Sequence, residues 1–291
     1  MVRPAETQIK SLIRLLSDEN DKVARAIGEK LVEIGDSAVP FLQEAEIERP
    51  ETARRIERIL DDIRGNRLEE ELWTLASCAD EAVTLERGVF LLARYAYPEL
   101  EVEPYMRWID EAAGELRDRM GPRVSGEEAV KTVGRYLFAE QGFRGNTKQY
   151  YDPENSYLNR VVDRRTGIPI SLSVLYLLIA RRLALPVHGV GMPGHFLVKF
   201  ESDRYEMFID CFNAGALLTQ KDCTRFLTQA GYGFEERYIE KSSTPAILIR
   251  TVKNLVAIYQ KLDEPVKEAR LTRFLAVLEA GRPSGETASS S

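Results

Sequence analysis

The sequence predicts an α+β protein that is mostly helical and carries a small antiparallel sheet in its second half. Apolar residues recur at helical spacing through residues 5–141, and an almost continuous apolar run follows over residues 172–183. After Pro186 the apolar residues alternate instead, which is typical of strands. These three patterns, taken in chain order, predict a helical first half, a buried helix and then a sheet.

The composition describes a globular chain and argues against one class of partner. The chain has 291 residues, of which 44% are hydrophobic and 30% charged, so it can form one large domain or two smaller ones. Its net charge of −6 argues against a general nucleic-acid binder, which usually presents a basic face. We therefore expect no nucleic-acid partner.

Targeting signals and disulfide patterns are not recognisable in this sequence. No apolar stretch approaches 18 residues without charge, and the N-terminus has no signal-peptide core. The three cysteines, Cys78, Cys211 and Cys223, have no spacing that suggests a disulfide framework, and we expect each of them in the core. We therefore expect a cytoplasmic protein that does not interact with membranes.

Metal and nucleotide chemistry are also disfavoured. His188 and His195 are the two histidines of the chain, too few to build a metal site from spacing alone. No glycine-rich phosphate loop is present. We expect neither a metal nor another cofactor.

Residues 1–82 are expected to form a helical region. One amphipathic helix covers Ile9–Leu16, a second covers Val23–Ile34 and ends at Gly35, and a third begins at Ala38. The order of helices and turns resembles a HEAT repeat, although a plain helical subdomain explains the same periodicity.

Helices continue into the following region, residues 83–243. Ser125 and Glu128 have capping-box spacing and open a helix that runs toward Phe138. A loop at Gly142 follows, and residues 152–165 could form one further helix. The apolar run then covers a helix nearly all round and predicts a buried helix that ends before Pro186.

The alternating segments predict a hairpin that brings two polar residues together. Residues 195–200 and 205–210 read as strands joined by a polar connector at 201–204, and Val187–Gly191 could add a third strand. A symmetric hairpin would pair His195 directly with Asp210 on one face, where the carboxylate could fix the histidine tautomer. The alternative is that His195 is an ordinary strand residue and Asp210 a turn residue.

The residues around this hairpin resemble the SirB-type family of the transglutaminase-like superfamily. The resemblance spans roughly residues 83–260, and related domains also occur in an F-box protein of the ubiquitin system. It rests on the stretches Gly142–Asn146, Tyr151–Asn159, Arg165–Ser173 and Gly191–Phe196.

The resemblance implies a papain-like arrangement with a cysteine at the start of the buried helix, a strand histidine and an aspartate on the next strand. His195 and Asp210 match the last two positions, but Pro169 stands where the cysteine belongs. Ser171 is the candidate replacement nucleophile, with Ser173 nearby, although capping or packing in the first turn of the helix is the more ordinary role for both.

A polar run before the buried helix supplies candidate binding residues. Asn155, Asn159 and Arg164 could line a cleft beside His195, or they could cap and brace loops. Residues 244–280 resemble a single tetratricopeptide-like helical hairpin, and residues 281–291 are expected to form a disordered tail.

Together these features indicate a degenerate transglutaminase-like protein, more a pseudoenzyme than an enzyme, that binds a protein or peptide or acts as a regulatory module. The alternative is a hydrolase or acyltransferase with a Ser-His-Asp arrangement.

Overall fold

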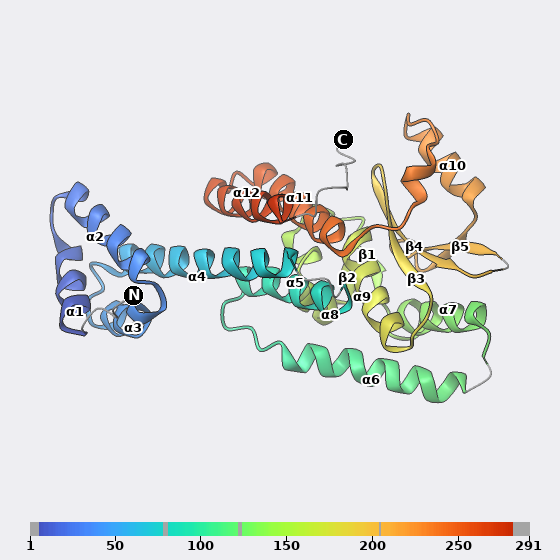
Figure 1. Cartoon of the computed structure of the whole chain (residues 1–291), viewed down its shortest axis with the longest axis horizontal. Coiled ribbons are helices and arrows are strands. Elements are labelled where there is room, and N and C mark those ends of the chain that lie inside the picture. Colours follow the sequence, from blue (N-terminus) through green and yellow to red (C-terminus); the bar gives the residue numbers. More distant parts are fainter. Residues whose placement is uncertain (1–5, 78–80, 122–123, 204, 282–291) are drawn as a thin grey trace. The chain divides into compact units, whose positions relative to one another are not determined.

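The computed structural model describes residues 6–77, 81–121, 124–203 and 205–281, which form an α+β protein that is mostly helical, as predicted (Figure 1). Two compact units comprise residues 1–71 and 72–291. The expected core position of Cys78 and the expected tail beyond residue 281 lie outside the described residues.

The first unit contains the helices expected from the sequence. Helix α2 begins after Asn20, whose side chain accepts a hydrogen bond from the Lys22 backbone N–H at 3.0 Å. It ends at Gly35, whose φ of +69° is a conformation that glycine adopts without strain. The HEAT-like description of this unit stays a prediction. Its elements are α1 (Glu6–Arg14), α2 (Asp21–Ile34), α3 (Val39–Glu48) and most of α4 (Ala53–Ala76).

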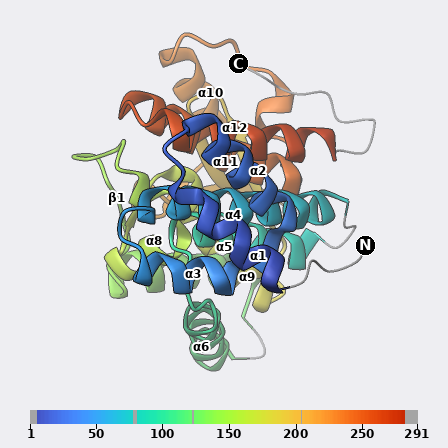
Figure 2. The ribbon, with the colours of Figure 1, turned by 90° about the vertical axis from the view of Figure 1, so that its left-hand side faces the viewer.

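Apolar side chains from all four helices meet in one core, and α1 contacts both α2 and α3 (Figure 2). Leu16, Leu31, Leu42 and Ile56 are among its fully buried members. These residues recur at the helical spacing seen in the sequence, so the spacing correctly predicts which face of each helix is buried.

In the second unit, several helices precede the sheet. Its helices before the sheet are α5 (Glu81–Ala96), α6 (Glu103–Met120), α7 (Gly126–Gly134) with the π-helical segment η3 (Arg135–Glu140), α8 (Leu158–Arg164) and α9 (Pro169–Arg182). The predicted cap at the start of α7 is confirmed, because the Ser125 side chain accepts a hydrogen bond from the Glu128 N–H at 3.2 Å.

Helix α9 is the predicted buried helix. Every residue from Pro169 to Ala180 is buried, and the helix contacts α6, α7, β3 and β4. The Tyr176 hydroxyl, which is fully buried, donates to the Val130 carbonyl at 2.7 Å. At the other end Arg182 forms ion pairs with Glu86 and Asp110. These contacts fix the position of the helix against α5, α6 and α7.

The main sheet has four antiparallel strands in the order β3-β4-β5-β6. Their bounds are β3 (Val187–Met192), β4 (His195–Glu201), β5 (Glu206–Asp210) and β6 (Ala216–Leu218). The first three strands were expected. The fourth strand was not predicted, because it is too short to show an alternating pattern. The same is true of a small parallel pair formed by β1 (Arg144–Gly145) and β2 (Thr166–Gly167).

The two faces of this sheet pack against different helices. Helix α9 contacts β3 and β4, whereas α10 (Gln220–Gln229) covers the opposite face with the buried residues Cys223 and Leu227. Leu197 of β4 belongs to the α10 cluster. Because alternate strand residues share a face, His195 lies on the α10 side as well.

The chain closes with α11 (Thr244–Lys261) and α12 (Pro265–Ala280), which pack against each other as the expected helical hairpin. Helix α11 also contacts α5 and α9, and the hydroxyls of Tyr157 and Tyr259 lie 3.1 Å apart. The likeness of the α11–α12 hairpin to a tetratricopeptide unit stays a prediction. The expected domain limits at residues 82, 243 and 280 stay predictions as well. None of the described helices is both long and apolar enough to cross a membrane.

Candidate functional site

His195 and Asp210 form a buried hydrogen-bonded pair at the end of the sheet. His195 Nε2 lies 2.9 Å from Asp210 Oδ2, and both residues are at least nine-tenths buried. The expected proximity of these side chains is therefore confirmed. Because Asp210 engages Nε2, the other ring nitrogen, Nδ1, is the one left for a ligand.

The predicted strand register is wrong by two residues. Phe200 pairs with Met207 and not with Tyr205. The last pair in this direction is Val198–Ile209, and the same register continued by one residue places Asp210 opposite Leu197. His195 and Asp210 are therefore diagonal neighbours, which long side chains can still join. An even shift leaves every side chain on its expected face.

The turn explains this shift. The strands continue to a Glu201–Glu206 pair, and the Ser202 N–H donates to the Tyr205 carbonyl at 3.1 Å. The Tyr205 side chain is held elsewhere, since its hydroxyl donates to Glu127 Oε2 at 2.7 Å. Tyr205 is thus a turn residue with a tertiary partner on α7, which strand alternation does not reveal.

Asp210 is fully supplied with hydrogen bonds. Its Oδ1 accepts from the backbone N–H groups of Phe212 and Asn213, both at 3.1 Å, and its Oδ2 accepts from Asn213 Nδ2 at 2.8 Å and from His195. Burial raises the pKa of this carboxyl, but the hydrogen bonds and charge of His195, together with Asn213, outweigh burial and leave the pKa below its usual value. Asp210 is therefore ionised at neutral pH and selects the His195 tautomer with a proton on Nε2.

Asn213 was not identified from the sequence as a site residue. The signal was present, because an aspartate followed by an asparagine three residues later is typical of side-chain-stabilised turns. Here that turn fixes the carboxylate that faces His195.

Arg250, from α11, holds the turn that carries His195. Its Nη2 donates to the carbonyls of Met192 and His195 at 2.7 and 2.9 Å, across the turn Met192-Pro193-Gly194-His195. Gly194 has φ +72°, which this tight turn needs. No local pattern could have predicted the contact, because Arg250 lies far along the chain.

The start of α9 lies at the same end of the sheet. Gly145 pairs with Gly167, two residues before Pro169, and a Cβ added at Gly145 would lie 2.5 Å from the Phe212 ring. The Phe212 ring is in turn 6.4 Å from the His195 ring. These contacts link the β1–β2 pair, which precedes α9, to Phe212 beside His195.

Ser171 acts as a capping residue. Its hydroxyl donates to the Asn155 carbonyl at 2.6 Å and accepts from the Ile168 N–H at 3.1 Å. Ser173 is fully buried, and its Oγ has no hydrogen-bond partner among the described residues that meets ordinary geometry. Among the described residues, neither serine makes a hydrogen bond to His195.

The described cysteines are buried as expected. Burial raises the pKa of the Cys211 thiol well above its usual value, and the neighbouring Ser173 hydroxyl lowers it only in part. Burial likewise raises the pKa of Cys223 to about 12. Cys211 thus faces Ser173 on α9, whereas Asp210 faces His195, which agrees with the expected alternation along β5.

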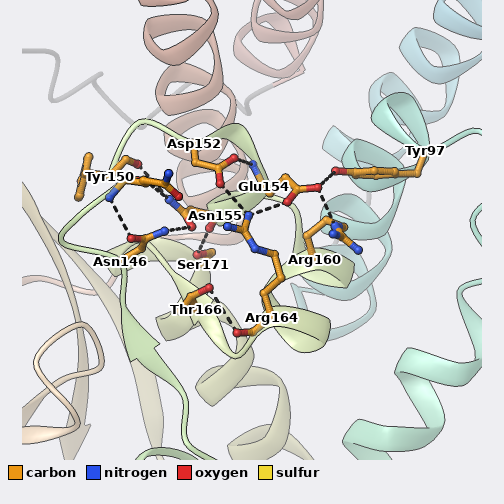
Figure 3. A network of polar contacts seen from close by, with 11 residues as sticks. Tyr97, Asn146, Tyr150, Asp152, Glu154, Asn155, Arg160, Arg164, Thr166 and Ser171 are labelled. Carbon is orange, nitrogen blue, oxygen red and sulfur yellow. Dashed lines mark hydrogen bonds and ion pairs between the residues drawn. The ribbon is translucent and has the colours of Figure 1, made fainter.

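Two of the three candidate binding residues, Asn155 and Arg164, belong to a polar network before α9 (Figure 3). The Asn155 amide donates to the carbonyls of Gln149 and Tyr150 at 2.7 and 3.2 Å and accepts from Asn146 at 3.0 Å. Its side chain is fully buried and braces the loop. The expectation of a single helix over 152–165 is wrong, because a 3₁₀ turn at Pro153–Asn155 is separated from α8.

Arg164 is also engaged within the protein. Its Nη1 donates to Asp152 at 2.8 Å and to Glu154 at 2.7 Å. Asn159 is buried, and its Oδ1 has no partner among the described residues. Ligand binding by Asn155, Asn159 and Arg164 stays a prediction, while the contacts of Asn155 and Arg164 favour the bracing role.

Within the described part of the chain, no group of three or more His, Cys, Asp or Glu side chains is arranged to hold a metal ion. The chemistry of the site therefore rests on one imidazole–carboxylate pair, the aromatic rings beside it and the cation of Arg250.

Comparison with known proteins places this arrangement in a family. Residues 103–253 match the family described as Transglutaminase-like superfamily, and the chain belongs to that superfamily. The matched segment contains α9, the complete sheet and both members of the His195–Asp210 pair.

The chain is similar to UPF0162 proteins of bacteria. It is 35% identical over 219 residues to the UPF0162 protein of Xylella fastidiosa strain Temecula1, which covers 73% of this chain and 78% of that protein. It is 28% identical over 206 residues to a UPF0162 protein of Pseudomonas aeruginosa, covering 70% and 74% of the two chains.

A second kind of relative shares only the central region. The F-box only protein 21 of Mus musculus is 34% identical over 143 residues, which make up 45% of this chain and 22% of that protein. No solved structure matches the chain.

Proposed function

We propose that the chain is a transglutaminase-like protein without the superfamily's nucleophilic cysteine, and that it binds a protein or peptide segment beside His195 and Asp210. The observation that carries the proposal is Pro169, the first residue of α9, where the resemblance to active enzymes requires a thiol. Proline suits the first turn of a helix but cannot attack a carbonyl.

The chemistry of the other candidate nucleophiles supports binding over catalysis. A reactive thiol needs a lowered pKa and access to solvent, whereas the Cys211 and Cys223 thiols are buried and their pKa values are raised. The Ser171 hydroxyl is engaged by the backbone at Asn155 and Ile168. A Ser-His-Asp hydrolase remains the alternative, and it would require Ser171 to leave these partners.

The helical regions on either side fit the same proposal. Helical repeats commonly present binding surfaces, so HEAT-like helices in residues 1–71 and the α11–α12 hairpin could extend the contact with a partner. The likeness to an F-box only protein is consistent with a regulatory role. The few cysteines without disulfide spacing favour a cytoplasmic location.

Thiol labelling tests this proposal. In a Cys78→Ser background, we expect Cys211 and Cys223 of the native protein to react with iodoacetamide at pH 7 at least about a hundredfold more slowly than a free thiol. Burial suppresses both thiolates, so labelling should become fast only in urea. His195→Ala should leave the slow native rate unchanged.

Two outcomes would contradict the proposal. Labelling that depends on His195, together with activity lost on Cys211→Ala, would show a working thiol enzyme. Peptide hydrolysis or transamidation that is lost in both His195→Ala and Ser171→Ala would show the serine enzyme instead.

A further inference from the structure

A continuous row of aromatic rings crosses the His195 site. The ring centroids of Tyr151 and Tyr150 lie 5.4 Å apart, those of Tyr150 and Phe212 6.0 Å, those of Phe212 and His195 6.4 Å, and those of His195 and Phe226 5.3 Å. We call these five residues the aromatic stripe. They come from the loop before α8, the turn after β5, the start of β4 and helix α10.

The stripe is open to solvent at both of its ends, whereas His195 between them is buried. Tyr151 is 47% exposed, and Tyr150 and Phe226 are each 37% exposed. Figure 3 shows Tyr150 at the edge of the polar network, where the Asn155 amide fixes its backbone carbonyl. Large aromatic side chains that converge on one site from separate elements and stay exposed are typical of a recognition surface.

Positive charges flank the stripe. Lys261 Nζ lies 3.4 Å from the centroid of the Tyr151 ring, and Arg250 contacts the His195 backbone. Lys148 is exposed two residues before Tyr150. None of these three cations forms an ion pair with a carboxylate in the part of the chain that the structure describes, although the whole chain carries a net charge of −6.

Three carboxylates close to the stripe in sequence or in contact with it are already engaged within the protein. Asp152 follows the stripe in sequence and pairs with Arg164 at 2.8 Å, and Glu154 pairs with Arg160 and Arg164 at 2.9 and 2.7 Å. Asp210 lies beneath His195 with all its hydrogen-bonding positions filled. The surface of the stripe therefore favours a negatively charged partner.

From this pattern we infer that the aromatic stripe binds an extended, acidic peptide segment with apolar or aromatic side chains at alternate positions. The inference rests on the proposed binding function and specifies its ligand. The ring separations of 5.3–6.4 Å are close to the roughly 6.6 Å between alternate residues of an extended chain. Alternate side chains would meet the rings while intervening carboxylates meet Lys148, Arg250 and Lys261.

A nucleic acid is a weaker fit to the same surface. Stacked bases also use exposed aromatic rings, but nucleic-acid binding draws most of its affinity from many phosphate contacts. Three unpaired cations on a chain with net charge −6 are too few to make many phosphate contacts. An oligonucleotide is therefore included in the test as a competing ligand.

Fluorescence anisotropy with the full-length protein tests the inference. The probe is a fluorescein-labelled peptide of about seven residues in which Asp and Phe alternate. Matched probes alternate Lys with Phe, or Asp with Gly, and a labelled oligothymidylate of similar length serves as the nucleic-acid arm. We expect the Asp–Phe peptide to bind at least about tenfold more tightly than each of the other three.

Substitutions at the exposed end of the stripe connect this binding to the structure. Tyr151→Ala and Lys261→Met should each weaken binding of the Asp–Phe peptide by about fivefold to tenfold, without lowering the melting temperature. Tyr232→Ala is the matched control, because that tyrosine is 39% exposed and lies outside the stripe. Lys22→Met, in the first unit, controls for the loss of a positive charge.

The outcomes separate the inference from the function on which it rests. Equal binding of the Asp–Phe and Lys–Phe peptides, sensitive to Tyr151→Ala, would overturn the acidic ligand but leave peptide binding at this site standing. Tighter binding of the oligothymidylate, or Asp–Phe binding that Tyr151→Ala and Lys261→Met leave unchanged, would overturn the inference altogether. So would failure of the Asp–Phe peptide to bind. The thiol-labelling and activity experiments above decide separately whether the chain is a thiol enzyme or a serine enzyme.

Discussion

Replacement of Asp210 with alanine should lower the free energy of unfolding by about 2–4 kcal/mol, because buried donors would lose their partner. The carboxylate accepts hydrogen bonds from two backbone N–H groups, from the Asn213 side chain and from His195. Urea denaturation at pH 7 measures the change. Asn213→Ala removes one of these bonds from an exposed residue and should cost about 1 kcal/mol or less.

The stability lost in the Asp210→Ala variant should depend on pH. The folded pKa of Asp210 is lowered, so the stability from its ionised form is complete above the unfolded pKa of about 4 and is lost as the pH falls through the folded value. The difference between wild type and Asp210→Ala should therefore be constant from pH 7 to about pH 5 and shrink below about pH 4. A difference that stays constant down to pH 2, or a variant as stable as wild type at pH 7, would contradict the geometry around Asp210.

Replacement of Asn155 with alanine should also destabilise the protein by about 2–4 kcal/mol, since its fully buried amide holds three partners in place. Loss of these bonds would release the loop that carries Tyr150. Urea denaturation gives the comparison, with Asn159→Ala as the matched control, because Asn159 Oδ1 has no described partner and its loss should cost clearly less. An Asn155→Ala variant that keeps full stability but loses peptide binding would favour direct ligand contact and exclude the bracing role.

The parts of the fold that depend on local pattern could be predicted from the sequence. Helix α9 was predictable because apolar residues cover it almost all round, and the cap at Ser125 because its spacing is local. The hairpin was predictable because strand alternation is strong on both sides of a polar connector. Each of these signals lies within one short segment of the chain.

The parts that depend on tertiary contacts were not predictable. The two-residue register shift accompanies a hydrogen bond from Tyr205 to Glu127 of α7, and the support of the His195 turn comes from Arg250 on α11. The proximity of His195 and Asp210 was nevertheless predictable, because a shift of two residues keeps both side chains on one face. The alternation of apolar and polar residues specifies the sheet face of His195 and Asp210, whereas the turn between β4 and β5 sets which residues pair.

The same division applies to the polar residues before α9. Their sequence pattern was equally compatible with a ligand cleft and with loop bracing, because asparagine and arginine serve both purposes. Only the positions of their partners separate these possibilities, as the contacts of Asn155 with the loop backbone and of Arg164 with Asp152 illustrate.

Restoration of the missing nucleophile is the most direct test of whether this chain lacks only the thiol of a transglutaminase-like site. In a Cys78→Ser background, Pro169→Cys would place a thiol at the N-terminus of α9, where the helix lowers a thiol pKa and an imidazole within reach would lower it further. We expect iodoacetamide to label it at pH 6–7 at least about tenfold faster than the same thiol in Pro169→Cys combined with His195→Ala. Equal labelling rates in the two variants would contradict the proposed degenerate site, because His195 would then be out of reach of the position that Pro169 occupies.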